Sequence, residues 1–242
     1  MNTTLADAHI LADGVRNQAE HCEHIEIVLC PPAVWLTELA HSIAPGKLPY
    51  LHLGAQNMYF EEIGTFTGEI SPLMVKEVAE YVILGHSERT HIFNEGPDLI
   101  KKKLASAFKH GLKPILCVGE DVREDGSKER LARELQYLVN ELSPEDMKTL
   151  VVAYEPVWAI SHGAAVPATP DYAQDVVAAL RQVVASETRV LYGGSINSEN
   201  VGGFLAQPDI DGYLIGGASL KLKDFLGVCI QANDLSIPKI SA

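Results

Sequence analysis

The chain has 242 residues, of which 47% are hydrophobic and 21% charged, the composition of a folded globular protein and not of a disordered one. Its net charge of −13 at pH 7 argues against nucleic acid or an anionic membrane as a partner, because both require a basic surface. With neither a membrane-length apolar run nor a signal peptide in the sequence, we expect a cytoplasmic protein. The four cysteines have no metal-binding spacing, so we expect reduced thiols without chemistry of their own.

Seven short apolar runs rich in β-branched residues recur along the chain, and each predicts a strand. In chain order they cover residues 25–30, 51–56, 81–86, 113–120, 149–155, 189–194 and 212–217. None of them alternates apolar with polar residues as a half-exposed strand would. We therefore expect both faces of the strands to be buried, as in a parallel sheet.

Helical patterns lie between these runs. Five apolar side chains share one helical face in residues 6–21: Ala8, Leu11, Ala12, Val15 and Ala19. Residues 98–111 end on Gly111, where a left-handed helix cap is expected, and Thr169-Pro170 supplies an N-cap and a first-turn proline to the next helix. Strand–helix units without a linker predict one α/β domain over residues 1–242, either doubly wound or a closed (β/α) barrel.

Polar or glycine-rich residues follow nearly every predicted strand. They are Gln56, Asn57, His86, Glu120, Glu155, Gly193, Gly194, Ser195, Gly216 and Gly217. In a barrel these strand ends meet on one face, where the active site is built, whereas an open sheet would spread them along a crevice. The glycine fingerprint of dinucleotide-binding folds is also absent after the first predicted strand. The barrel is therefore favoured.

Two of these residues carry side chains suited to proton transfer. Glu155 ends an apolar strand, where a carboxylate is partly desolvated and becomes a usable base near neutral pH, although a lone acid there is more often a salt bridge or a helix cap. His86 precedes a helical turn whose positive end disfavours the imidazolium form, so it can donate a hydrogen bond as a neutral group. A buried structural histidine is the alternative.

The glycine pairs predict the class of substrate. Gly193-Gly194 and Gly216-Gly217 each follow one of the last two strands. Without Cβ atoms, their backbone N–H groups can converge on a phosphate, and loops after the last two strands of such a barrel often form a phosphate site. One pair alone would be an ordinary tight turn, but two pairs at consecutive strand ends favour phosphate binding.

Seven motifs, in order and over almost the whole chain, resemble those of the triosephosphate isomerase family. They are GAQNM, FTGEIS, VILGHSER, LCVGE, AYEPVWAI, YGGSIN and DGYLIGGASL. The resemblance implies a (β/α)8 TIM barrel and an isomerase of glycolysis and gluconeogenesis. Such an enzyme interconverts dihydroxyacetone phosphate and D-glyceraldehyde 3-phosphate by proton transfer through an enediolate, with no metal and no organic cofactor.

The resemblance also implies the role of each site residue. Glu155 would be the base that moves the proton between two carbons of the triose, and His86 the neutral group that polarises the carbonyl. Ser195, Gly216 and Gly217 would bind the phosphate.

Further family positions imply support for the site and a partner subunit. Glu88 and the Arg89/Glu95 pair match positions that support the active site, with ordinary surface ion pairs as the alternative. The loop 57–71 is too long for a simple connection, and in the family it reaches into the neighbouring subunit, with the position of Thr67 near the partner's active site. A homodimer is implied.

The sequence departs from the family pattern at its beginning. The family starts with a strand ending in Asn-x-Lys-Met-Asn, whose lysine lies against the substrate, whereas this sequence begins at Met1-Asn2. We expect residues 1–242 alone to be at least about 100-fold less active than a chain that carries that strand, because a preorganised cation is lost. Three alternatives would each explain the difference: misassignment of the start, deliberate shortening, or a natural variant with a differently closed barrel.

The second departure is in the lid. After the matching hinge 156–158, the family has a Gly-Thr-Gly-Lys lid that closes over the phosphate, whereas residues 161–167 read SHGAAVP. The resemblance therefore does not imply the family's closed-state contacts for this segment. The alternative function is a non-catalytic barrel that binds a phosphorylated metabolite through its glycine loops.

Overall fold

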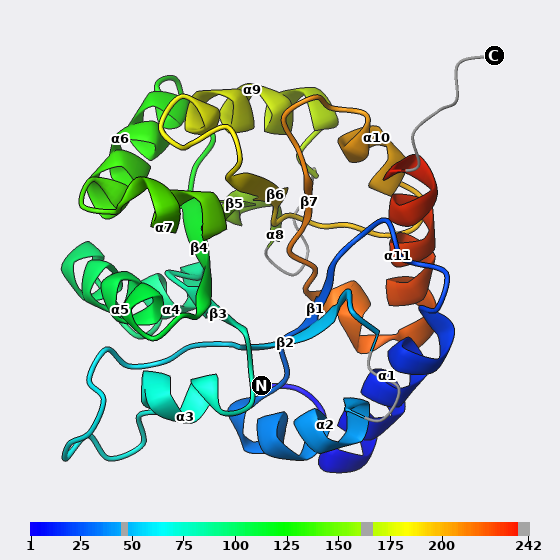
Figure 1. Cartoon of the computed structure of the whole chain (residues 1–242). Coiled ribbons are helices and arrows are strands. Elements are labelled where there is room, and N and C mark those ends of the chain that lie inside the picture. Colours follow the sequence, from blue (N-terminus) through cyan, green and yellow to red (C-terminus); the bar gives the residue numbers. More distant parts are fainter. Residues whose placement is uncertain (45–47, 161–166, 237–242) are drawn as a thin grey trace.

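The computed structural model describes residues 1–44, 48–160 and 167–236 and contains one parallel sheet inside a ring of helices (Figure 1). The strands are β1 (Ile27–Leu29), β2 (Leu51–Ala55), β3 (Tyr81–Leu84), β4 (Lys113–Glu120), β5 (Val151–Pro156), β6 (Arg189–Tyr192) and β7 (Gly212–Tyr213). They pair in chain order from β1 to β7, and every pairing is parallel. All seven predicted strands are confirmed, most of them shorter than the apolar runs suggested.

Helices cover the outer face of this sheet. They are α1 (Leu5–Gln18), α2 (Leu36–Ile43), α3 (Pro72–Lys76), α4 (Ser87–His91), α5 (Pro97–Lys109), α6 (Ser127–Val139), α7 (Pro144–Thr149), α8 (Val157–Ile160), α9 (Pro170–Arg181), α10 (Val201–Leu205) and α11 (Leu222–Ser236). Two 3-10 turns, Ala33–Trp35 and Gly217–Leu220, add to them. The predicted barrel architecture is confirmed, and β1 and β7 are the edges of the sheet in the part of the chain that the structure describes.

Strand side chains alternate between two separate cores. Ile115, Cys117, Val151 and Ala153 belong to a cluster built from strand residues and lie inside the barrel. The intervening residues pack against the helices instead, as Tyr154 does within the large outer cluster. Both faces of the strands are therefore buried, as the lack of polar alternation predicted.

The predicted helix signals hold in the structure. On the expected face of α1, Ala8, Ala12 and Val15 are buried, whereas Leu11 is only partly so. Thr169 caps α9 by accepting a hydrogen bond from the backbone N–H of Tyr172 at 3.3 Å. This cap fixes where α9 begins, and therefore where the loop before it ends.

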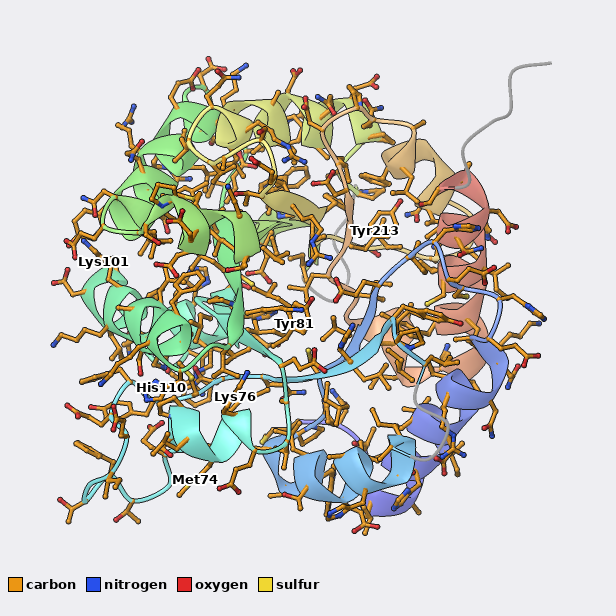
Figure 2. All side chains as sticks on the ribbon, in the orientation of Figure 1. Met74, Lys76, Tyr81, Lys101, His110 and Tyr213 are labelled. Atoms are coloured by element: carbon orange, nitrogen blue, oxygen red, sulfur yellow. The ribbon has the colours of Figure 1, made fainter. Side chains whose placement is uncertain are left out.

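A charged cluster closes the end of the barrel at which the strands begin. The Tyr81 hydroxyl donates to Glu26 at 2.5 Å, and Arg189 forms an ion pair with the other oxygen of Glu26. His52 places Nε2 3.0 Å from Glu26 as well. Tyr81, near the middle of the view in Figure 2, thus joins the polar cluster to the inner core. Groups at this end of a barrel serve stability, and the strand ends that carry the predicted site lie opposite.

No helix in residues 1–44, 48–160 or 167–236 is long and apolar enough to cross a membrane.

Gly111→Ala is expected to lower the free energy of unfolding by about 1 kcal/mol, because Gly111 has a φ of +67° that a side chain strains. A Cβ there would approach only Lys76 Nζ, at 3.7 Å, so the effect isolates backbone strain from crowding. Gly202→Ala, within α10 and with its nearest contact at 4.0 Å, is the control and is expected to stabilise the protein. Chemical denaturation measures both. Equal effects of the same sign would contradict this account of Gly111.

Candidate active site

Glu155 lies at the end of β5 among the side chains that point into the barrel. It pairs with Gly119 of β4 and has the same parity as the inner residues Val151 and Ala153. Its side chain is 1% exposed. A buried carboxylate is costly unless polar groups satisfy it, so the residues around Glu155 decide whether the site is stable.

Two donors from one turn hold the two oxygens of Glu155. His86 Nε2 lies 2.9 Å from Oε1, and the backbone N–H of Ser87 donates to Oε2 at 2.9 Å. The turn follows β3 and begins at Gly85, whose φ is +72° and where a Cβ would lie 3.0 Å from the carbonyl oxygen of Cys117. Glycine is required there on both counts. The structure thus brings the two predicted catalytic residues into direct contact.

The imidazole of His86 is oriented by its second nitrogen. Nδ1 accepts a hydrogen bond from the backbone N–H of Glu88 at 3.2 Å, which leaves the hydrogen of a neutral ring on Nε2, facing Glu155. Burial lowers the pKa of His86, but the hydrogen bond to Glu155 and the negative charges of Glu155 and Glu88 outweigh it and raise the pKa above its ordinary value. The helix-end effect expected from the sequence is thus opposed by Glu155.

The turn after β6 packs directly against Glu155. The N–H of Gly193 donates to the carbonyl oxygen of Tyr154 at 2.7 Å. A Cβ on Gly193 would lie 3.2 Å from Glu155 Cγ, so a side chain at this position would push the carboxylate out of place. The glycine therefore lets the β6 turn approach the carboxylate closely.

The three predicted phosphate-binding residues lie on loops after β6 and β7, which pair through Tyr192 and Tyr213. Ser195, Gly216 and Gly217 are all exposed. A Cβ on Gly216 or Gly217 would meet no atom within 4 Å, and Gly216 has a φ of −88°. Neither crowding by neighbouring atoms nor a positive φ at Gly216 therefore requires glycine in this loop. The open space around the two glycines leaves the backbone of the loop accessible to a ligand.

The supporting residues divide into exposed and buried ones. The side chains of Glu88 and Thr67 are exposed, and the contact of Glu88 with His86 comes from its backbone. Arg89 donates to Glu95, which is only 6% exposed and also binds the buried Lys103 at 2.7 Å. The alternative of an ordinary surface pair is therefore wrong for Arg89/Glu95, because Glu95 lies in a buried network.

Sequence reasoning missed a second buried carboxylate beside the site. Glu120, at the end of β4, is fully buried and accepts hydrogen bonds from the Tyr154 hydroxyl at 2.7 Å, Trp158 Nε1 at 3.0 Å and the Tyr172 hydroxyl at 2.6 Å. Its place at a strand end was visible in the sequence. Its donors come from β5, α8 and α9 at no recognisable spacing, so only the fold brings them together.

The predicted lid falls almost entirely outside the described residues. Of residues 161–167, only Pro167 is described, whereas the preceding hinge residues 156–158 are the end of β5 and the start of α8. Within the described ranges, no group of three or more His, Cys, Asp or Glu side chains is arranged to hold a metal ion. The four cysteines are free thiols.

The fold and this geometry define an α/β-barrel enzyme whose strand ends bring a carboxylate and an imidazole into contact. The family model of triosephosphate isomerase matches residues 1–232. The chain is 40% identical over 243 residues to a triosephosphate isomerase of Dehalococcoides mccartyi strain 195, covering 97% of this chain and 95% of that protein. It is also 40% identical over 241 residues to that of strain BAV1, covering 96% and 93%. The chain belongs to the triosephosphate isomerase family.

Glu155→Gln is expected to lower the pKa of His86, because the hydrogen bond with the Glu155 carboxylate and then its charge are the main causes that raise it, and burial would then dominate. NMR titration of the histidine ring resonances measures this change. The exposed His21 provides an internal control in the same spectra. A His86 titration that does not move would mean that Glu155 does not face the imidazole in solution.

Proposed function

We propose that this protein is a triose-phosphate isomerase that interconverts dihydroxyacetone phosphate and D-glyceraldehyde 3-phosphate. The observation that carries the proposal is the contact of His86 Nε2 with Glu155, 2.9 Å apart at the ends of β3 and β5 in a chain of this family. One group suits proton removal and the other suits stabilisation of the negative charge that forms on oxygen. Among the described residues, the proposed chemistry draws on these two side chains and on a means of holding the phosphate.

The proposed reaction moves one proton between two carbons and one between two oxygens of the triose. Glu155 takes a proton from the hydroxymethyl carbon of dihydroxyacetone phosphate, while the carbonyl oxygen gains negative charge and accepts a hydrogen bond from His86 Nε2. The proton of the O1 hydroxyl passes to O2, which leaves the enediolate charge on O1, and Glu155 then returns its proton to C2, which yields the aldehyde. The single hydrogen on Nε2 cannot serve Glu155 and the substrate at full strength together, so substrate binding competes with the 2.9 Å contact.

This competition supports a neutral His86 during the reaction. The hydrogen bond and charge of Glu155 raise the pKa of His86 in the unliganded site. A carboxylate that turns from the imidazole toward a substrate carbon weakens both effects, whereas burial and the N–H of Glu88 on Nδ1 remain. A neutral imidazole is then favoured, and it stays a hydrogen-bond donor to the developing oxyanion.

The phosphate is proposed to bind at Ser195, Gly216 and Gly217. The net charge of −13 would repel a phosphorylated substrate, so the positive potential has to be local. Backbone N–H groups supply such potential without a lysine or arginine, and the open space beside Gly216 and Gly217 leaves room for an anion. No metal and no organic cofactor enters the proposed reaction.

Exposed apolar side chains support the proposed homodimer. In the loop 57–71, which carries Thr67, Ile63 is 85% exposed and Phe66 41% exposed. Met74, on the following helix α3 and labelled at the edge of Figure 2, is 60% exposed. Neighbouring apolar side chains of this size favour contact with a second copy. A cytoplasmic location suits a glycolytic substrate and remains part of the proposal.

Glu155→Asp is expected to lower kcat about 100-fold or more with little change in KM, because withdrawing the carboxylate by one methylene weakens proton transfer and leaves phosphate binding intact. A coupled isomerase assay measures both constants. Glu145→Asp, at an exposed position of α7, is the matched control. Equal changes in kcat and KM would contradict the role of Glu155, and phosphate binding without turnover in the unaltered protein would support the non-catalytic alternative.

Ser195→Ala is expected to weaken the binding of substrate and inorganic phosphate about tenfold, because it removes a donor to a charged ligand. Inhibition of the isomerase by inorganic phosphate measures the affinity. The control is Ser186→Ala, which alters an exposed serine whose hydroxyl contacts Glu187. An unchanged phosphate affinity would place the phosphate site elsewhere.

A further inference from the structure

Glu120 is the most completely buried carboxylate next to the site, and its two oxygens have different partners. Oε2 accepts from the Tyr154 hydroxyl and from Trp158 Nε1. Oε1 accepts from the Tyr172 hydroxyl at 2.6 Å. Losing Tyr172 would therefore leave one oxygen of a fully buried acid without that partner, an unfavourable state.

The donors outweigh the cost of burying Glu120. Burial raises the pKa of Glu120, but hydrogen bonds, led by those from Tyr172, Trp158 and Tyr154, outweigh burial and lower it below its ordinary value. The carboxylate is thus charged at neutral pH and bound firmly to residues from three segments. Because the charged carboxylate of Glu120 binds all of these donors, it also restrains the positions of their side chains.

Tyr172 is itself held on several sides. It is the third residue of α9, and its backbone N–H is capped by Thr169. The Arg123 guanidinium lies 4.3 Å from its ring centre, and the indole of Trp158 packs against the ring at 5.7 Å and 77°. Arg123 also lies 6.0 Å from the Trp158 ring. The hydroxyl of Tyr172 is therefore directed at Glu120 by packing and not by one contact alone.

The two residues that donate to Glu120 Oε2 lie on either side of Glu155, the proposed base, in the sequence. Tyr154 immediately precedes Glu155, and Trp158 follows it by three residues. Tyr154 packs in the outer core, so its hydroxyl meets Glu120 on the helix side of the sheet while Glu155 points inward. Any shift of Glu120 is transmitted to both sides of Glu155 through the end of β5 and α8.

We propose that Tyr172 is a positioning residue of the active site: its hydroxyl fixes Glu120, and Glu120 in turn fixes Tyr154 and Trp158 on either side of Glu155. The proposal rests on the isomerase function proposed above. It assigns Tyr172 no contact with substrate. Loss of the Tyr172 hydroxyl changes the orientation of the Glu155 carboxylate and leaves the loops that carry Ser195, Gly216 and Gly217 unchanged.

The test compares Tyr172→Phe with Tyr137→Phe. Tyr137 is a matched control, since its hydroxyl also donates to a carboxylate, Asp98, and Lys101 lies 4.8 Å from its ring centre. Isomerase kinetics and inhibition by inorganic phosphate are measured for both variants. The protein is also labelled with 5-fluorotryptophan, and the Trp158 resonance is assigned by Trp35→Phe, because the chain has two tryptophans.

Tyr172→Phe is expected to lower kcat about tenfold, with KM and phosphate inhibition changed by less than about twofold, and to shift the Trp158 fluorine resonance. Tyr137→Phe is expected to change none of these. Equal behaviour of the two variants, or a lower melting temperature of Tyr172→Phe with normal kcat and an unmoved resonance, would overturn the proposal. If the unaltered protein has no isomerase activity, the proposed function fails, and the Trp158 resonance alone still decides whether Tyr172 positions Trp158.

Discussion

The buried carboxylate of Glu155 is the constraint on which the rest of the site depends. At 1% exposure it can remain in the barrel only if both oxygens are satisfied, and the turn after β3 supplies both donors, His86 Nε2 and the Ser87 N–H. That turn needs a positive φ at Gly85 and the β3–β4–β5 order that places it opposite Glu155. The parallel sheet thus sets the distance between base and imidazole, and the turn sets their orientation.

A second carboxylate, Glu120, lies on the opposite face of the same pair of strands. Glu120 pairs with Pro156 in the β4–β5 register, one residue after the pair formed by Gly119 and Glu155. Because successive strand residues point to opposite faces, one acid faces the barrel and the other the helices. Each carboxylate has its own hydrogen-bond donors. The two acids nevertheless lie on paired strands, so a change at Glu120 can reach Glu155 through the backbone of β5.

The sequence predicted the strands because burial on both faces leaves an unmistakable apolar run, and it predicted Glu155 and His86 because polar residues interrupt those runs at the ends. It could not give the donors of Glu120, since Trp158 and Tyr172 meet that carboxylate only through the fold. For the same reason the sequence could not show that the Arg89/Glu95 ion pair is buried, because the burial of a side chain depends on the tertiary structure. Most predicted strands ran past the end of the observed strand, because the residues that follow, such as Gly85 and His86, belong to the turn and not to the sheet.

The central claim is that Glu155 and His86 transfer a proton between two carbons of a triose phosphate. The most direct measurement is conversion of dihydroxyacetone phosphate in D2O, with the aldehyde trapped by oxidation as it forms and analysed by proton NMR. The account predicts deuterium at C2 of the product, because a proton carried by a carboxylate exchanges with solvent before it is returned. It also predicts loss of this conversion in Glu155→Gln. Absence of conversion in the unaltered protein, or conversion with no deuterium in the product, would contradict it.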